Sequence, residues 1–250
     1  MNRTLYLFDV DGTIAESSKT ISTKAKNCIS TLMLMGFHVG IVGGGKMDKI
    51  ITQLDGLTFN HYFSECGCVY YKSNNKTLEQ VYVKNIRDHV LYPKINIIVK
   101  EAMKFIANVD YLISGHFIDL RNGIIYISLV GMCASNDERA NYIRLDEMYG
   151  YRDKLLLILG EKAKDIGIYD GIEMVAGGSV GIALYPTEYN KVQVIVHLYK
   201  NYDTIHYFGD KYKKDGNDYK LLNHPLVIGH SVNTVEDTEK ILDGICDIFN

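Results

Sequence analysis

A short apolar run near the N-terminus that ends in two aspartates limits the possible folds of this chain more than any other segment. Residues 5–13 read Leu-Tyr-Leu-Phe-Asp-Val-Asp-Gly-Thr. An apolar run of this length before a turn signal predicts a buried strand. Asp9 and Asp11 stand where the strand ends, so both carboxylates can face one pocket while Val10 packs away from it. One carboxylate can attack phosphorus while the other donates a proton to the leaving oxygen, and the pair suits a hard cation. The alternative is an ordinary strand that ends in an Asp-Gly turn.

Length and composition narrow the class of protein. The 250 residues suffice for one large domain or two modest ones with a sizeable core. A formal net charge of −3 argues against a general nucleic-acid binder. No apolar run approaches the length that spans a bilayer, and no signal sequence precedes the first strand, so we expect no membrane partner. The five cysteines include no CxxC pair, and reduced thiols in a cytoplasmic protein are their simplest interpretation.

Alternating apolar runs and helical stretches predict a parallel α/β sheet at both ends of the chain. The expected strands are 5–8, 37–42, a segment around Tyr62, 69–71, 204–210 and 226–229, and the expected helices run from Ser22 to Gly36, from Met47 to Leu54 and onward from Thr234.

The middle of the chain follows a different pattern. It contains a long helical stretch from about Val83 through Lys104, a hairpin of residues 114–120 and 124–130 joined by Arg-Asn-Gly, a charged helical region at 136–164, and two short strands around Gly177 and Gly178. Hairpins and helices without strand–helix–strand alternation predict an inserted α+β domain. The predicted fold class is therefore α/β, with a Rossmann-like parallel-sheet core at 1–82 plus 187–250 and an α+β cap domain at 83–186.

Further polar features stand at the carboxyl ends of the expected strands, where α/β sheets bind ligands. The second strand enters the glycines 43–45, whose amides can approach an anion closely. Asp210 ends a late strand, and Asp218 follows in a Gly-Asn-Asp segment. Lys191 lies where the cap would return the chain to the core. Together with the first two aspartates, these residues predict a Mg²⁺ site, an amide cradle for phosphate, and a lysine that neutralises phosphoryl charge.

The order of these motifs resembles that of the haloacid-dehalogenase-like phosphotransferases, and along nearly the whole chain it is similar to the eukaryotic-type phosphomannomutases. The segments that carry this resemblance are collinear: 8–13, 42–44, 117–123, 137–139, 177–178, 185–186 with 190–191, 205–210, 216–218 and 229–232. The resemblance implies a cytoplasmic isomerase of nucleotide-sugar supply that interconverts mannose 6-phosphate and mannose 1-phosphate, with glucose phosphates as further candidate substrates. The implied route passes through an aspartyl phosphate and a hexose 1,6-bisphosphate.

The resemblance also implies roles for single residues. Asp9 would be the nucleophile, and Asp11 the general acid and base. Lys191 would pair with the nucleophile and the transferring phosphoryl group. The Mg²⁺ ligands would be Asp9, Asp11 (through its backbone carbonyl), Asp210 and Asp218.

Further implied residues would contact the substrate, and the cap would move. The phosphate- and substrate-binding residues would be Gly43, Gly44, Arg121, Arg139, Gly178 and Ser179, with the two arginines on the non-reacting phosphate. Opening and closing of the cap would gate reorientation of the bisphosphate and protect the aspartyl phosphate from water. Because members of the family dimerise through the cap, the resemblance also implies a homodimer.

The chain departs from the family pattern in its sugar-binding part. Family arginines are replaced by Ser18 and Met132, a serine and an aspartate that bind sugar hydroxyls by Gly181 and Ala183, and an asparagine near the hairpin by Tyr126, while an additional cation site at 223–227 lacks its aspartate and threonine. Each charge-assisted hydrogen bond to phosphate contributes about 1.5–3 kcal/mol, so these losses weaken or alter substrate binding. Two alternatives therefore stay open: a Mg²⁺-dependent phosphatase of altered specificity, and a non-catalytic homologue that only binds sugar phosphates.

Overall fold

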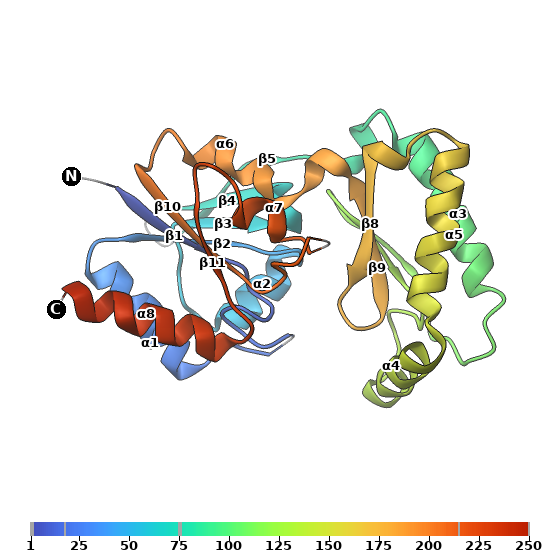
Figure 1. Ribbon diagram of the computed structural model, residues 1–250, viewed down its shortest axis with the longest axis horizontal. Helices are drawn as coiled ribbons and strands as arrows, with labels where there is room; N and C mark the ends of the chain where they lie inside the picture. The colour runs from blue at the N-terminus through green and yellow to red at the C-terminus, as the bar shows by residue number, and fades with distance from the viewer. Residues whose placement is uncertain (1–2, 18, 75–76, 215, 250) are drawn as a thin grey trace. The chain divides into compact units, whose positions relative to one another are not determined.

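The chain folds into two compact units (Figure 1). The computed structural model describes residues 3–17, 19–74, 77–214 and 216–249, so Ser18 lies outside the described residues. The core unit comprises Met1–Val83 and Asn190–Asn250, and the cap unit comprises Lys84–Tyr189.

The core unit is built on a seven-stranded sheet in the order β11-β10-β1-β2-β3-β4-β5. Its strands are β1 (Thr4–Phe8), β2 (His38–Val42), β3 (His61–Ser64), β4 (Val69–Asn74), β5 (Thr77–Val83), β10 (Thr204–Gly209) and β11 (Ile228–Ser231). The first five strands in this order are parallel, whereas β4 runs antiparallel to both of its neighbours, β3 and β5. Phe8 of β1 pairs with Phe208 of β10, so these two central strands end together and the residues after them share one edge.

Helices cover both faces of this sheet because side chains alternate along each central strand. Tyr6 and Phe8 pack into a cluster with α1 (Thr23–Leu34), α2 (Met47–Leu54) and α8 (Val235–Phe249). Leu5 and Leu7 pack into a second cluster with the 3₁₀ helix η5 (Lys191–Val194), α6 (Ile195–Leu198) and α7 (Tyr219–Leu222). Full burial stabilises by about 1.5–3 kcal/mol per large apolar side chain, so this two-sided packing fixes where β1 ends.

Local sequence signals set the ends of the helices in the core unit. The Ser22 hydroxyl accepts a hydrogen bond from the Ala25 amide at 3.0 Å, and this confirms the predicted N-cap of α1. At the start of α8, Thr234 Oγ1 accepts from the Asp237 amide at 3.3 Å, and the Asp237 carboxylate accepts from the Asn233 amide at 3.1 Å. Thr234 therefore caps the last helix as predicted, whereas the return hydrogen bond of the predicted capping box comes from Asn233 instead of Thr234.

The cap unit contains a four-stranded antiparallel sheet in the order β6-β7-β9-β8. One face of this sheet is covered by α3 and α5, as Figure 1 shows. Strand residues such as Ile127 and Ile182 are fully buried. The described residues also form the 3₁₀ helices η1 (Glu65–Gly67) in the core unit and η2 (Ile86–Asp88), η3 (Tyr169–Gly171) and η4 (Thr187–Tyr189) in the cap unit. The elements of the cap are α3 (Tyr92–Ile106), β6 (Ile118–Leu120), β7 (Ile125–Ser128), α4 (Asn136–Tyr149), α5 (Tyr151–Asp165), β8 (Ile172–Gly177) and β9 (Gly181–Pro186).

Two predicted helical stretches differ from the structure, and one strand was not predicted. The helix expected from about Val83 begins only at Tyr92, because Pro93 stands in the first turn, where its missing N–H costs nothing. Residues 77–83 form strand β5 instead of leading into that helix. The charged helical region at 136–164 is two helices, because Gly150 adopts a left-handed conformation with φ of 64° between them.

The last strand and the cap hairpin are also placed differently. The strand expected at 226–229 is β11, which starts at Ile228. The hairpin strands expected at 114–120 and 124–130 are present but shorter, as β6 and β7.

Candidate functional site

The end of strand β1 places Asp9 in a buried position at the carboxyl edge of the sheet. Its amide continues the ladder by donating to the Phe208 carbonyl at 2.9 Å, and only 6% of the residue is exposed. Val10 turns into the apolar core, and its carbonyl accepts hydrogen bonds from the amides of Thr13, Ile14 and Ala15 at 3.1–3.3 Å. This tight turn ends the strand and fixes the Asp9 carboxylate.

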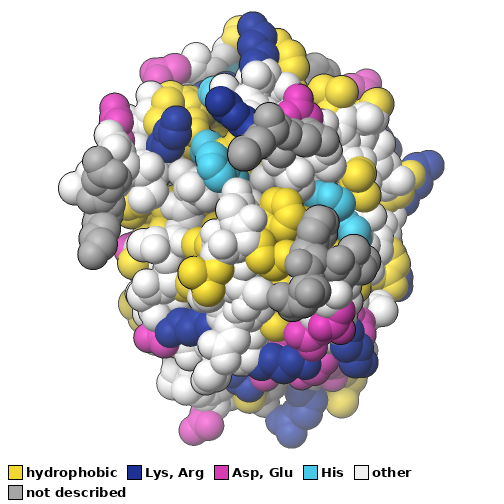
Figure 2. All heavy atoms as spheres, turned by 90° about the vertical axis from the view of Figure 1, so that its left-hand side faces the viewer, with side chains coloured by type: hydrophobic (Ala, Val, Ile, Leu, Met, Phe, Trp, Pro, Cys, Tyr) yellow, Lys and Arg dark blue, Asp and Glu magenta, His cyan; other side chains and the backbone are white. Residues whose placement is uncertain are grey.

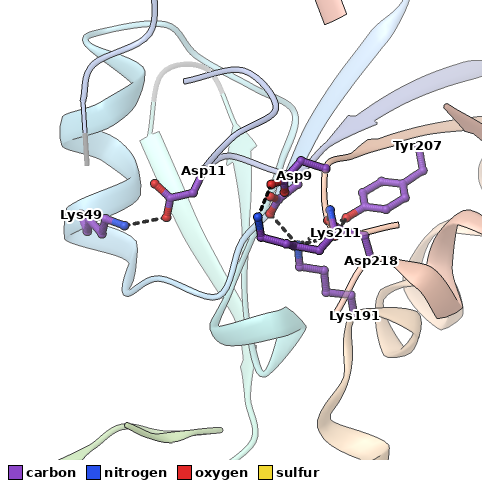
Figure 3. Close-up of polar contacts among 8 residues, drawn as sticks. Asp9, Asp11, Lys49, Lys191, Tyr207, Lys211 and Asp218 are labelled. Carbon is purple, nitrogen blue, oxygen red and sulfur yellow. Dashed lines mark hydrogen bonds and ion pairs between the residues drawn. The ribbon is translucent and has the colours of Figure 1, made fainter. Parts of the chain in front are cut away.

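A fully buried lysine joins two carboxylates at this edge (Figure 3). Lys191 Nζ lies 2.5 Å from Asp9 Oδ1 and 2.6 Å from Asp218 Oδ1, and the lysine side chain is 1% exposed. The Tyr207 hydroxyl donates to the same oxygen of Asp218, and the Lys211 amide donates to the other oxygen at 2.9 Å. Asp218 therefore holds the lysine, and the lysine holds Asp9.

Burial and charge shift the pKa values of this cluster in different directions. Burial raises the pKa of Asp9 to about 7, with help from the charges of Asp218 and Asp210 and against the attraction of Lys191. Burial also raises the pKa of Asp218, but its ion pair with Lys191 outweighs burial and holds that pKa below the ordinary value. Burial lowers the pKa of Lys191, whereas the two carboxylates raise it well above its usual range. Lys191 is thus charged, and Asp9 is an unusually basic carboxylate of the kind found at functional sites.

Three carboxylates meet closely enough to share one cation. Ligand atoms of Asp9, Asp210 and Asp218 all lie within 4.8 Å of one another. Asp210 Oδ2 pairs with Lys211 Nζ at 2.6 Å, whereas Asp210 Oδ1 is buried and accepts no hydrogen bond from any described residue. Gly12, with φ of 86°, permits this approach, because a Cβ there would lie 2.6 Å from Asp210 Oδ2.

The structure does not bring the Asp11 carboxylate into this group. Asp11 Oδ2 lies 2.6 Å from Lys49 Nζ, and Oδ1 accepts from Gln53 Nε2 at 2.8 Å. Both partners come from α2, and Figure 3 shows Asp11 directed toward Lys49 and away from Asp9. Sequence reasoning missed Lys49 and Gln53, although their spacing of four residues places them on one face of a helix.

The predicted amide cradle after β2 is wrong for Gly43. Its amide donates to the Phe63 carbonyl at 2.9 Å and therefore has no hydrogen left for an anion. The Gly43 carbonyl accepts from the Cys66 amide at 2.9 Å, and the Gly45 carbonyl accepts from the Glu65 amide at 3.0 Å. Pairing with the segment after β3 thus holds this turn, in which Gly44 also lies. This pairing was not predictable from the local sequence, because it joins residues about twenty positions apart.

The remaining predicted residues all belong to the cap unit. Arg121 Nε donates to Asp119 Oδ2 at 2.8 Å. Arg139 donates to the carbonyls of Ala134 and Met132 at 3.0 and 3.2 Å. Gly178 and Ser179 form the turn between β8 and β9. The structure thus places the two arginines and this turn in one unit and the acidic cluster in the other.

The fold and the acidic cluster together define a class of protein. A parallel sheet whose central strands end in a buried carboxylate–lysine cluster, with an α+β unit inserted in the chain, is typical of the haloacid-dehalogenase-like proteins. The structure of an N-terminally truncated Plasmodium falciparum IMP-nucleotidase has this fold, with a TM-score of 0.67 and 15% identity over 98% of this chain and 70% of that one.

Sequence comparison defines the family within this class. The model of the eukaryotic phosphomannomutase family matches residues 29–248, and this chain belongs to that family. A phosphomannomutase of Schizosaccharomyces pombe is 33% identical over 98% of this chain and 95% of its own length. A probable phosphomannomutase of Caenorhabditis elegans is 31% identical over 98% of this chain and 96% of its own length. The resemblance inferred from the motifs is therefore confirmed.

Two observations concern membranes and nucleic acids as possible partners. In the part of the chain that the structure describes, no helix combines the length and apolar character needed to cross a bilayer. On the face drawn in Figure 2, lysines and arginines are interspersed with acidic residues. Such mixing differs from the continuous basic surface typical of nucleic-acid-binding proteins.

Proposed function

We propose that this protein is a phosphomannomutase that interconverts mannose 6-phosphate and mannose 1-phosphate through an aspartyl phosphate and a hexose 1,6-bisphosphate. The observation that carries the proposal is the buried Asp9–Lys191–Asp218 cluster, at the end of β1, in a chain that matches phosphomannomutases over nearly its whole length. A carboxylate placed beside a buried ammonium group is held ready for attack on a dianionic phosphoryl group.

Asp9 and Asp11 divide the chemistry of the two half-reactions. Phosphorylated Asp9 gives its phosphoryl group to a free hydroxyl of the bound hexose monophosphate, and Asp11 takes the hydroxyl proton. The product is a hexose 1,6-bisphosphate, which then turns around. Asp9 attacks its other phosphoryl group, the P–O bond to the sugar breaks, and Asp11 returns the proton to the leaving oxygen. Lys191 orients Asp9 and balances the charge of the phosphoryl group throughout.

Asp11 must leave Lys49 to act in this way. The two side chains are 38% and 39% exposed, and exposed ion pairs contribute only about 0.2–1 kcal/mol. Exchange of Lys49 for a substrate hydroxyl therefore costs little. Until then, the contact with Lys49 holds the Asp11 carboxylate in place.

The carboxylates at this edge fit Mg²⁺. All candidate ligand atoms are oxygens, which Mg²⁺ prefers, and Asp210 Oδ1 is buried without a donor among the described residues. Two further buried oxygens close in sequence to these aspartates, Thr13 Oγ1 and Asn217 Oδ1, also have no hydrogen-bond partner among the described residues. Asp9, Asp210 and Asp218 would hold the ion together with the backbone carbonyl of Asp11. When bound, Mg²⁺ supplies positive charge that stabilises the transferring phosphoryl group.

The cap unit supplies the second requirement of a mutase, a binding site for the phosphate that is not reacting. We assign this role to Arg121 and Arg139, supported by Gly178 and Ser179. Arg139 uses Nε and Nη2 for the Ala134 and Met132 carbonyls, and within the described part of the chain its Nη1 donates to nothing. A guanidinium group held in this way can present its outer nitrogens to phosphate oxygens.

The test is an Mg²⁺-dependent assay with mannose 1-phosphate or glucose 1-phosphate, each with its 1,6-bisphosphate. Formation of 6-phosphate and release of inorganic phosphate are followed together, with Asp9→Asn as the inactive control. We expect isomerisation to exceed phosphate release. Phosphate release without isomerisation would replace the mutase with a phosphatase on the same scaffold, and no turnover would leave only sugar-phosphate binding.

We also propose a cytoplasmic location and a homodimer formed through the cap. All five cysteines are free thiols, which fits a reducing compartment. The cap unit exposes Leu112 and Leu157 by 84% and 70%, and large exposed apolar side chains suit a subunit contact. Sedimentation of the full chain tests the dimer, and a monomer at micromolar concentration would contradict it.

A further inference from the structure

A tyrosine on the face of the cap sheet opposite α3 and α5 contacts both the β8–β9 hairpin and Arg121. Tyr126 of β7 stands opposite Asp119 of β6 and Ala183 of β9 in the antiparallel register. Its neighbours in the strand, Ile125 and Ile127, are 2% and 0% exposed on the face that α3 and α5 cover. Because side chains alternate along a strand, Tyr126 projects from the opposite face.

The tyrosine ring lies directly against the β8–β9 hairpin. Its hydroxyl donates to the Gly177 carbonyl at 2.9 Å. A Cβ at Gly177 would lie 3.1 Å from the ring atom Cε2, and a Cβ at Gly181 would lie 2.6 Å from Cζ and from the hydroxyl oxygen. The same Cβ would lie 2.5 Å from the carbonyl oxygen of Ile127. The ring therefore takes the volume of a side chain at position 181 and fixes the hairpin through its hydroxyl.

The same ring supports one of the two arginines assigned to phosphate binding. The guanidinium carbon of Arg121 lies 5.3 Å from the ring centroid of Tyr126, and Arg121 Nε donates to Asp119 at 2.8 Å. The ring and the carboxylate thus hold the guanidinium plane in a defined orientation. Cation–π contacts of this kind are stronger where water is largely excluded, and the Arg121 side chain is only 15% exposed.

Two further arginines act on the same tyrosine. Burial raises the pKa of the Tyr126 phenol, whereas the positive charges of Arg121, Arg139 and Arg152 lower it, so all three guanidinium groups are near. Arg152 Nη1 also donates to the Gly178 carbonyl at 3.1 Å. Tyr126 therefore contacts both the β8–β9 hairpin and Arg121, and the charges of Arg139 and Arg152 also reach it.

We propose that Tyr126 is a positioning residue for phosphate binding by the cap. Its ring orients Arg121 and its hydroxyl fixes the β8–β9 hairpin, so that the cap presents a rigid basic surface to a phosphomonoester dianion. This inference rests on the proposed function, which supplies that dianion as the non-reacting phosphate of the substrate. Preorganised arginines lose less conformational entropy on binding, so affinity depends on the tyrosine even without a direct contact to the ligand.

The test compares three variants of the full chain. Tyr126→Leu removes the ring, Tyr126→Phe keeps the ring but loses the hydroxyl, and Tyr169→Leu is the matched control. Tyr169 also belongs to the cap unit and lies under a cation, Lys164 Nζ at 4.8 Å from its ring centroid, but it is remote in sequence from the arginines concerned. Affinity for glucose 1,6-bisphosphate is measured by calorimetry with Mg²⁺ in the Asp9→Asn background, where no turnover occurs. KM and kcat are measured with Asp9 intact.

We expect Tyr126→Leu to weaken bisphosphate binding about tenfold and to raise KM by the same factor, with kcat within about twofold of the parent. Tyr126→Phe should rescue affinity to within about threefold, and Tyr169→Leu should bind like the parent. Unchanged affinity in Tyr126→Leu, or a fall in kcat and thermal stability without a change in affinity, would overturn the inference. Failure of the Asp9→Asn parent to bind the bisphosphate would overturn it too. Tyr126-dependent binding in a protein that forms no isomer would instead refute the mutase activity alone.

Discussion

Replacement of Lys191 by methionine tests whether a buried ammonium group organises the core unit. The variant keeps the length of the apolar stem but leaves Asp9 and Asp218 without their shared cation, and the two side chains are only 8% and 0% exposed. Removing one partner of a buried ion pair destabilises a protein by about 3–5 kcal/mol. For a chain of this size that loss lowers the melting temperature by roughly 6–20 °C.

Lys49→Met is the matched control because it also removes a lysine from an aspartate of the site. The Lys49–Asp11 pair is about as close, at 2.6 Å, but its side chains are 39% and 38% exposed. Exposed pairs contribute about 0.2–1 kcal/mol, so this variant should melt within roughly 4 °C of the parent. Thermal and urea unfolding followed by circular dichroism measure both. Equal destabilisation by the two substitutions would refute the argument that burial determines how much an ion pair contributes to stability.

The pH dependence of Lys191→Met gives a second check. Burial raises the pKa of Asp9 to about 7 even with Lys191 opposing it, so loss of the lysine raises that pKa further. A carboxyl group whose folded-state pKa is raised loses its contribution to stability as pH rises from its unfolded value through its folded value. The variant should therefore be closer to the parent in stability at pH 6, where Asp9 holds a proton, than at pH 8.5. A penalty that is larger at pH 6 would contradict this assignment of charge.

Three further outcomes follow from single contacts. Tyr207→Phe removes a hydrogen bond to the charged Asp218, so it should lower stability by about 1.5–3 kcal/mol and also lower kcat. Tyr62→Phe is the control: it loses a hydrogen bond from a backbone amide, so it should lower stability but leave turnover unchanged. Mg²⁺ at 100 times its dissociation constant should stabilise the parent against urea by about 2.7 kcal/mol, and Asp210→Asn should remove most of that gain. Burial lowers the pKa of His61 to about 3, so stability should fall below pH 6.5 as the unfolded chain takes up the proton, by about 2 kcal/mol at pH 5; urea unfolding of His61→Gln should show a shallower loss between pH 7 and pH 5.

The central strands were predictable because their signal is local. Strands β1, β2 and β10 are short apolar runs with a turn signal directly after them. Strand β5 lacks such a signal, since six of its seven residues are exposed and it pairs only with β4 at the edge of the sheet. Its pairing depends on a partner strand rather than on its own pattern, and propensity alone could not separate it from the helix expected after it.

The sequence predicts those parts of the candidate site that depend on where strands end. It does not predict the parts that depend on contacts between side chains. Residues that follow neighbouring parallel strands must share one edge, which is why Asp9 and Asp210 lie together. The hydroxyl of Tyr207 gave no such signal, because an aromatic residue within an apolar strand is normally core. The partner of Asp11 depends on how far Lys49 reaches from α2, and no spacing rule supplies that distance.

The charges at the end of β1 explain how residues from separate sequence motifs act as one site. Counted as ionised, Asp9, Asp210 and Asp218 carry three negative charges, and Lys191 and Lys211 carry two positive ones, so the cluster is left with one net negative charge. A phosphorylated substrate is repelled by that charge until a divalent cation reverses its sign. Burial makes the reversal effective because charges interact more strongly where water is excluded. The aspartates therefore select the cation, and only the cation together with Lys191 makes the same aspartates a binding site for phosphate.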